Sequence, residues 1–286
     1  MLKDLRSKLV ARLMSRHVAG PGISDALPIC RWADARGIRT NIEPWPFANE
    51  SANSMKRNYI TAARSVGPQI RDCTLGLKLP AIGYDQGLFA EVADAAQAAG
   101  VKIYFGSLDH ESAGEYFSFL ERVVAQGHRP GCTLPSRWMR SLDDVQRVVD
   151  LGLNVRVVKG QWVDPDSPRL DDRKNFLEIV SRLAGRSRLV GVATHDVPLA
   201  ETALGRLSKS NTEFEVEQFF SLPLNCMDLA KRFKCNYRIH VTYGGEGIPY
   251  NTRFAFRRPQ IFFLMAGDLV GRRRYPWAGE PPDSVV

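Results

Sequence analysis

The segment that decides the expected fold is Asn154-Val155-Arg156-Val157-Val158-Lys159-Gly160. Its aliphatic residues predict a buried parallel strand that carries an arginine and ends at a Lys-Gly pair. A second apolar segment, residues 189–194, ends in a similar way at His195 and Asp196. A helical pattern follows each segment. Strands with polar ends that alternate with helices are typical of a barrel whose chemistry lies at the carboxyl ends of its strands.

The same alternation runs along most of the chain. Segments rich in β-branched and aliphatic residues predict eight strands, at residues 38–43, 73–79, 101–105, 131–134, 154–159, 189–194, 212–216 and 237–242. Apolar residues three and four apart predict helices between them, for example at residues 88–99, 142–151, 175–183 and 199–207. Gly100, Gly127 and Gly152 lie where such helices would end. Further helices are predicted at residues 2–17 and 25–35.

The sequence therefore predicts an α/β fold, a (β/α)8 barrel of the TIM type with extra N-terminal helices. Residues 1–36 would form the N-terminal helical extension, residues 37–270 the barrel, and residues 271–286 a flexible C-terminal tail. A length of 286 residues with 44% hydrophobic content suits one such domain.

Composition excludes several classes of protein. The five cysteines form no CxxC pair, so we expect reduced, mostly buried thiols and no zinc site. No segment resembles a transmembrane helix or a signal peptide, so a soluble, cytoplasmic protein is expected. The net charge of +8 is scattered, which disfavours nucleic acid as a partner. We interpret the basic run at residues 272–274 as a solvated tail, with a weak peripheral contact to anionic lipid as the alternative.

Ionisable residues gather at the predicted strand ends. Each has an ordinary explanation, and Arg156 in particular could pair with a neighbouring carboxylate. Lys78, Arg156 and Lys159 together nevertheless favour a phosphate or carboxylate ligand. The histidines show no metal-binding spacing, so no metal site is expected. The strand-end residues are Glu43, Lys78, the loop 109–111, Pro135, Arg156, Lys159, His195, Glu215, Glu217, His240 and Tyr243.

The region after the last predicted strand carries a second pattern. A glycine-rich loop at residues 243–250 leads into a helix start, and Arg253 and Arg257 then share one helical face with Tyr250. An arginine can bind a carboxylate with two hydrogen bonds while an aromatic ring covers apolar carbons. This pattern favours a small amino acid or another carboxylate as ligand.

These motifs resemble the proline dehydrogenase family. Residues 155–160 are similar to its Arg-Leu-Val-Lys-Gly strand, residues 193–196 to its Ala-Thr-His-Asn/Asp strand end, and residues 77–79 to its Val-Lys-Leu strand. Residues 243–259 resemble its Tyr-Gly to Pro-Tyr-x-x-Arg-Arg stretch. Residues 16–20 and 37–39 resemble its N-terminal region, so the similarity spans about residues 15–270.

The resemblance implies a distorted barrel that binds FAD non-covalently at the strand ends and oxidises L-proline to 1-pyrroline-5-carboxylate by hydride transfer to the flavin. The cofactor-binding residues it implies are Arg156, Lys159, Gly160, Thr194, His195 and Glu215. The catalytic and substrate-binding residues it implies are Lys78, Asp109, Tyr250 and Arg253, with Arg257 as a partial replacement for a missing arginine. The electron acceptor would be a quinone or oxygen.

Four positions depart from the family pattern. Phe254 replaces a second substrate arginine, Arg257 replaces a glutamate, His240 replaces a tyrosine, and Pro135 lies near the position of a glutamine that faces the flavin. Loss of one charge-assisted contact to a buried carboxylate costs about 2–3 kcal/mol, or roughly a hundredfold in affinity. The alternatives are a related enzyme for another amine or N-substituted amino acid, a flavin-free barrel that binds an anion, and a non-catalytic ligand-binding descendant.

Overall fold

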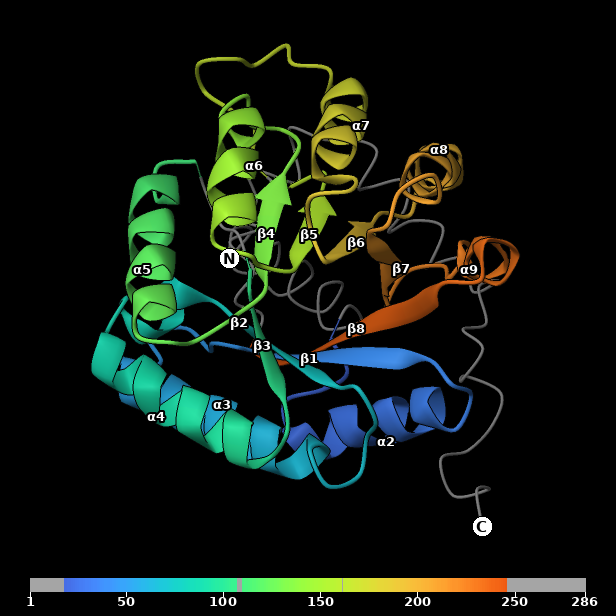
Figure 1. Cartoon of the computed structure of the whole chain (residues 1–286). Helices are drawn as coiled ribbons and strands as arrows, with labels where there is room; N and C mark the ends of the chain where they lie inside the picture. The colour runs from blue at the N-terminus through green and yellow to red at the C-terminus, as the bar shows by residue number, and fades with distance from the viewer. Residues whose placement is uncertain (1–17, 107–109, 161, 246–286) are drawn as a thin grey trace, which may run out of the picture.

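The computed structural model describes residues 18–106, 110–160 and 162–245 of the chain. Eight parallel strands alternate with helices in a TIM-type barrel (Figure 1). The strands are β1 (Arg39–Trp45), β2 (Thr74–Leu77), β3 (Lys102–Phe105), β4 (Cys132–Pro135), β5 (Val155–Val158), β6 (Leu189–Ala193), β7 (Glu213–Phe219) and β8 (Asn236–Gly244). The helices are α2 (Ile23–Asp34), α3 (Ala52–Val66), α4 (Gln86–Ala98), α5 (Ala113–Ala125), α6 (Ser141–Asp150), α7 (Asp172–Leu183), α8 (Val197–Leu207) and α9 (Met227–Phe233), with a short 3-10 helix η2 (Leu79–Ile82).

Strand pairing closes the barrel. The sheet runs in the order β3-β2-β1-β8-β7-β6-β5-β4, and β1 pairs with β8 over its whole length. Between β3 and β4 the contact is shorter, with one parallel bridge from Tyr104 to Gly131. The backbone N–H of Phe105 donates to Gly131 O (2.8 Å), and that of Gly131 donates to Ile103 O (2.8 Å). The helices form a ring around the strands, and α2 covers the outside of β1 and β8 (Figure 1).

The predicted strands and helices are confirmed, with shifts at their ends. Gly100, Gly127 and Gly152 follow α4, α5 and α6 with φ values of 69°, 94° and 66°, the left-handed conformation that glycine adopts without strain. The largest difference among the strands is β7, which continues to Phe219 instead of ending at Val216. The helix predicted at residues 2–17 and the tail at 271–286 lie outside the described residues.

The two faces of the barrel strands differ in polarity. Outward side chains such as Leu75, Val157 and Val192 are fully buried against the helices. Because side chains alternate along a strand, the neighbouring residues face the barrel interior, and this set is polar. It comprises Asn41, Thr74, Arg156, Glu215, Glu217, Arg238 and His240, all at most 5% exposed. The apolar core therefore lies between sheet and helices, while ion pairs and hydrogen bonds fill the barrel.

The described residues also test two expectations from composition. All five cysteines are free thiols, four of them buried and Cys235 partly so, as predicted. Among the helices that the structure describes, none is long and apolar enough to cross a membrane.

Candidate active site

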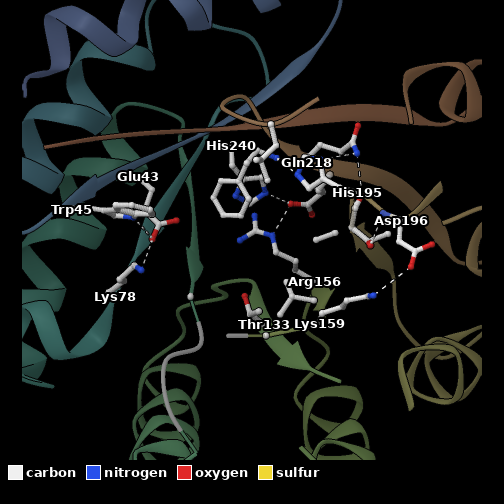
Figure 2. Close-up of a pocket in the computed structure, with 18 residues that line it drawn as sticks. Glu43, Trp45, Lys78, Thr133, Arg156, Lys159, His195, Asp196, Gln218 and His240 are labelled. Carbon is white, nitrogen blue, oxygen red and sulfur yellow. Dashed lines mark hydrogen bonds and ion pairs between the residues drawn. The ribbon is translucent and has the colours of Figure 1, made fainter. Parts of the chain in front are cut away.

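A cavity of about 410 Å³ opens at the carboxyl ends of the strands. Its lining comes from β1 and from β4 to β8, and from residues that follow the strands, including Lys78 after β2 and Gly106 after β3. Figure 2 shows Lys78, Glu43 and Trp45 on one side of this cavity, Lys159, His195 and Asp196 on the other, and Arg156 between them. The volume lies within the range of small-molecule sites in proteins.

Each lysine or arginine in the lining has a carboxylate partner. Lys78 Nζ lies 3.5 Å from Glu43 Oε1, and Lys159 Nζ lies 3.3 Å from Asp196 Oδ2. Arg156 Nε lies 2.6 Å from Glu217 Oε2. The expectation of surplus cations among Lys78, Arg156 and Lys159 is therefore wrong, since each of the three has a carboxylate partner. The sequence did not reveal these pairs because the partners come from other strands and loops.

The floor of the cavity is the Arg156–Glu217 pair. Arg156 Nε donates to Glu217 Oε2 (2.6 Å), its Nη2 donates to Asn41 Oδ1 (3.4 Å), and its guanidinium carbon lies 4.8 Å from the centre of the Tyr104 ring. His240 Nε2 reaches the same Glu217 oxygen at 2.5 Å. The guanidinium is thus fixed from three sides, which prepares it to face a ligand without rearrangement.

Burial and charge oppose each other at Glu217. Burial alone would raise the pKa of this carboxyl, but Arg156 and the hydrogen bond from His240 outweigh it and lower the pKa to about 2. For His240, burial and the charge of Arg156 lower the pKa, and Glu217 only partly compensates. The floor therefore consists of an ionised carboxylate, a cationic guanidinium and a neutral imidazole at neutral pH.

The Lys159 side of the cavity carries a net positive charge. Asp196 caps the N-terminus of α8, where its Oδ1 accepts the backbone N–H of Leu199 (3.2 Å). Its other oxygen contacts both Lys159 and Arg173, so two cations share one carboxylate. The side chains of Lys159 and Arg173 are 32% and 49% exposed, which leaves them within reach of an anion from solvent.

His195 is held as a neutral ring. Its Nε2 accepts the backbone N–H of Phe219 (3.1 Å), so the proton lies on Nδ1, which donates to Pro223 O (3.2 Å). Burial lowers the pKa of this histidine to about 4, while the Pro223 carbonyl acts in the opposite direction. Both ring nitrogens are thus engaged within the protein, and His195 presents an uncharged ring to the cavity.

The Lys78 side combines a cation with an aromatic surface. Lys78 Nζ lies 4.9 Å from the centre of the Trp45 ring, and Trp45 Nε1 donates to Glu43 Oε1 (3.1 Å). Burial would raise the pKa of Glu43, but Lys78 above all lowers it below its usual value. This arrangement places an ammonium group and an indole face at one wall of the cavity.

The structure brings together most of the site residues inferred from the sequence. The inferred residues that line the cavity are Lys78, Arg156, Lys159, Gly160, Thr194 and His195. Glu215 does not line it; this carboxylate lies deeper in the barrel and binds Arg238 through both oxygens (2.7 and 3.2 Å). The inferred residues Asp109, Tyr250, Arg253 and Arg257, together with Phe254, lie outside the described residues.

Other lining residues have no cofactor or substrate role in the sequence-based interpretation, although Glu217 and Asp196 are among its strand-end residues. Glu217, Gln218 and Phe219 reach the cavity because β7 is longer than predicted, and Trp45 ends β1 while Asp196 follows β6. The alternation Glu215, Glu217, Phe219 was a usable signal, because residues two apart on a strand face the same side. Pro135, although at the end of β4, does not line the cavity, whereas Thr133 does.

One group of potential metal ligands occurs in the described part of the chain, although none was expected. Ligand atoms of His110, Asp164 and Asp166 lie within 4.8 Å of one another. Asp164 accepts the backbone N–H groups of Met139 and Asp166, each at 2.9 Å, and lies 3.6 Å from His110 Nε2. These contacts explain the burial of Asp164 as part of the loop structure.

The residues of the cavity fit a flavin nucleotide. Gly160 lines the wall with φ at 83°, and a Cβ at this position would lie 2.8 Å from Pro135 Cβ, so only glycine keeps this approach open. The net positive side at Lys159 suits a phosphate group, and the Arg156 guanidinium suits a ring system that accumulates negative charge.

Comparison with known proteins finds proline dehydrogenases as distant relatives. No family model matches the chain. Proline dehydrogenase 1 from Bacillus subtilis (strain 168) is 22% identical over 274 residues, covering 89% of this chain and 90% of that protein. Proline dehydrogenase from Deinococcus radiodurans is 23% identical over 293 residues, covering 94% of each. The chain is a distant, nearly full-length relative of the proline dehydrogenases.

A solved structure supports the fold. Proline utilization A from Bdellovibrio bacteriovorus, inactivated by N-propargylglycine, superimposes with a TM-score of 0.73 at 14% identity over 99% of this chain. The match covers 36% of that longer protein. At this identity the likeness establishes the barrel architecture alone.

Proposed function

We propose that this protein is a FAD-dependent oxidoreductase that oxidises the C–N bond of L-proline or a related cyclic or N-substituted amino acid. The relationship to proline dehydrogenases indicates oxidoreductase chemistry on a CH–NH group. The observation that carries the proposal is the position of Arg156, whose buried guanidinium lies at the floor of a cavity formed by the strand ends. The barrel domain would span residues 37–270, as the sequence predicts.

The cofactor would lie across the ends of β5 and β6. Lys159, Gly160, Thr194 and His195 line this part of the cavity, and the positive side shared by Lys159 and Arg173 would hold a phosphate group. FAD would supply the hydride acceptor that amino acid side chains lack. Arg156 would stabilise the negative charge that builds up as the substrate is oxidised.

The substrate would lie nearer β1 and β2. Lys78 offers an ammonium group to a carboxylate, and the Trp45 ring can cover the apolar carbons of a small amino acid. We retain Asp109, Tyr250, Arg253 and Arg257 as proposed substrate-pocket residues from the family resemblance. The electron acceptor, a quinone or oxygen, remains a prediction from that resemblance.

The choice between proline and a relative depends on His240 and Phe254. His240 lies in the cavity floor and donates to Glu217, so it presents a neutral imidazole where the family pattern has a phenol. Such a change alters both the shape and the hydrogen-bonding capacity of the pocket. A related amino acid is therefore included in the proposal on equal terms with proline.

FAD binding to the purified protein tests the cofactor part. Lys159→Met is expected to weaken FAD binding at least tenfold, because a charge-assisted hydrogen bond contributes about 1.5–3 kcal/mol. Arg182→Gln is the matched control, since this cation lies on the exposed surface of α7 with Glu178. Equal FAD affinity in both variants would contradict the placement of the phosphate, and no FAD binding by the wild-type protein would favour a flavin-free barrel.

A further inference from the structure

A chain of oriented hydrogen bonds lies directly beneath the cavity. Thr74 Oγ1 donates to Asn41 Oδ1 (2.8 Å), and Arg156 Nη2 donates to the same oxygen (3.4 Å). These two donors fix the orientation of the Asn41 amide, so its Nδ2 faces His240 Nδ1 (3.4 Å). Each residue in this chain is at most 5% exposed.

The amide orientation fixes the tautomer of His240. Since Asn41 Nδ2 carries protons, His240 Nδ1 must accept, and the ring proton must lie on Nε2. That proton points to Glu217 Oε2 at 2.5 Å. A second proton on His240 would lie on Nδ1 and face the Asn41 Nδ2 donor. The contacts therefore define a neutral imidazole that donates to an ionised carboxylate.

Glu217 connects this chain of hydrogen bonds to Arg156, the cation at the cavity floor. Its Oε2 receives both Arg156 Nε and His240 Nε2, while its Oε1 is buried and has no hydrogen-bond partner among the described residues. A carboxylate with one free oxygen in a buried site is costly, since an isolated buried charge or acceptor is destabilising. A glutamine amide oxygen could accept both hydrogen bonds without carrying the charge.

We propose that Glu217 is a positioning residue that sets the charge at the cavity floor: it fixes the Arg156 guanidinium and offsets part of its positive field. Arg156 then stabilises negative charge through directed N–H groups with a moderated net charge, and the unpaired positive charge lies on the Lys159 side. The expected effect on bound FAD rests on the proposed flavin function, whereas the positioning of Arg156 by Glu217 rests on the contacts alone.

The groups around His240 agree with this assignment. Asn41 and Glu43 face it from β1, Arg156 from β5, Glu217 and Phe219 from β7, and His195 from the end of β6. Arg156 is the cation among them and disfavours a charged imidazole, whereas the carboxylates favour it. Burial adds to the effect of Arg156, so the negative charge at the floor belongs to Glu217 and is not shared with a protonated His240.

The test is the two-electron midpoint potential of bound FAD in the wild-type protein and in Glu217→Gln. The variant keeps the shape and both hydrogen bonds but removes the charge, so reduced FAD should gain about tenfold in relative affinity. That corresponds to a potential about 30 mV more positive. Asp144→Asn is the matched control, because Asp144 is a buried carboxylate of α6 that pairs with Arg140 and does not line the cavity.

An unchanged or more negative potential in Glu217→Gln, with Asp144→Asn like wild type, would overturn the proposal. A second measurement needs neither the variant nor the cofactor. Nitrogen NMR of the wild-type protein should show His240 neutral at pH 7 with its proton on Nε2, and His195 neutral with its proton on Nδ1. A charged His240, or a proton on its Nδ1, would refute the inference even if the protein bound no FAD and the proposed function failed.

Discussion

Gly191→Ala should displace the Glu217 carboxylate at the floor of the cavity. A Cβ at Gly191 would lie 1.9 Å from Glu217 Oε1 and 2.8 Å from its Cδ, so the buried carboxylate must move. Overpacking of this kind costs about 1–3 kcal/mol, and breaking a buried ion pair costs about 3–5 kcal/mol. We expect a loss of about 3 kcal/mol in the free energy of unfolding, a large part of the roughly 5–15 kcal/mol that stabilises a typical domain.

Urea denaturation measures this loss, with FAD affinity as a second readout. Gly205→Ala is the control, because Gly205 lies in α8 and an added Cβ would meet nothing within 4 Å. This variant should be as stable as wild type, or more stable by about 0.5–1 kcal/mol, since alanine favours a helix. Unfolding of Gly191→Ala at the same urea concentration as wild type would contradict the close approach of Glu217 to Gly191.

Three further predictions concern other parts of the cavity. Burial lowers the pKa of His195 to about 4, so the unfolded chain binds a proton at this residue before the folded protein does as the pH falls. The free energy of unfolding should therefore decrease from about pH 6.5 to pH 4. Urea unfolding of His195→Gln across this pH range should show a smaller decrease than wild type. Lys78→Met removes the cation beside the Glu43 carboxylate, so the free energy of unfolding should fall by about 1–3 kcal/mol at pH 7. The loss should be smaller at pH 4, where Glu43 can take up a proton. An equal loss at both pH values would argue against the ion pair. Phe254→Arg should raise proline turnover by roughly tenfold or more if the pocket is a weakened proline site, and steady-state kinetics that show unchanged or lower turnover would indicate a different substrate.

The fold could be predicted because its signals are local. Aliphatic strands, amphipathic helices and glycines at helix ends recur in strict alternation, and each element is recognisable from its own residues. The end of β7 was missed for a physical reason. Glu215 and Glu217 look like residues that end a strand, but the barrel interior neutralises them with Arg238 and Arg156, so the strand continues to Phe219.

The site could be predicted in part. Arg156, Lys159 and His195 stand at strand ends, so their approach to one cavity follows from the topology of a barrel. Their partners could not be read from the sequence in the same way, because Glu217 is 61 residues from Arg156 and the pairing depends on strand register. The sequence therefore indicates the cations that line the cavity, and the structure is needed to show that each has a carboxylate partner.

The visible absorption spectrum of the purified protein under anaerobic conditions tests the central proposal most directly. We expect an oxidised flavin spectrum, after incubation with FAD if necessary, that bleaches when L-proline or a related cyclic amino acid is added. A flavin spectrum that no such amino acid changes would contradict the proposed substrate class, and a protein that remains colourless with excess FAD would contradict the proposed cofactor.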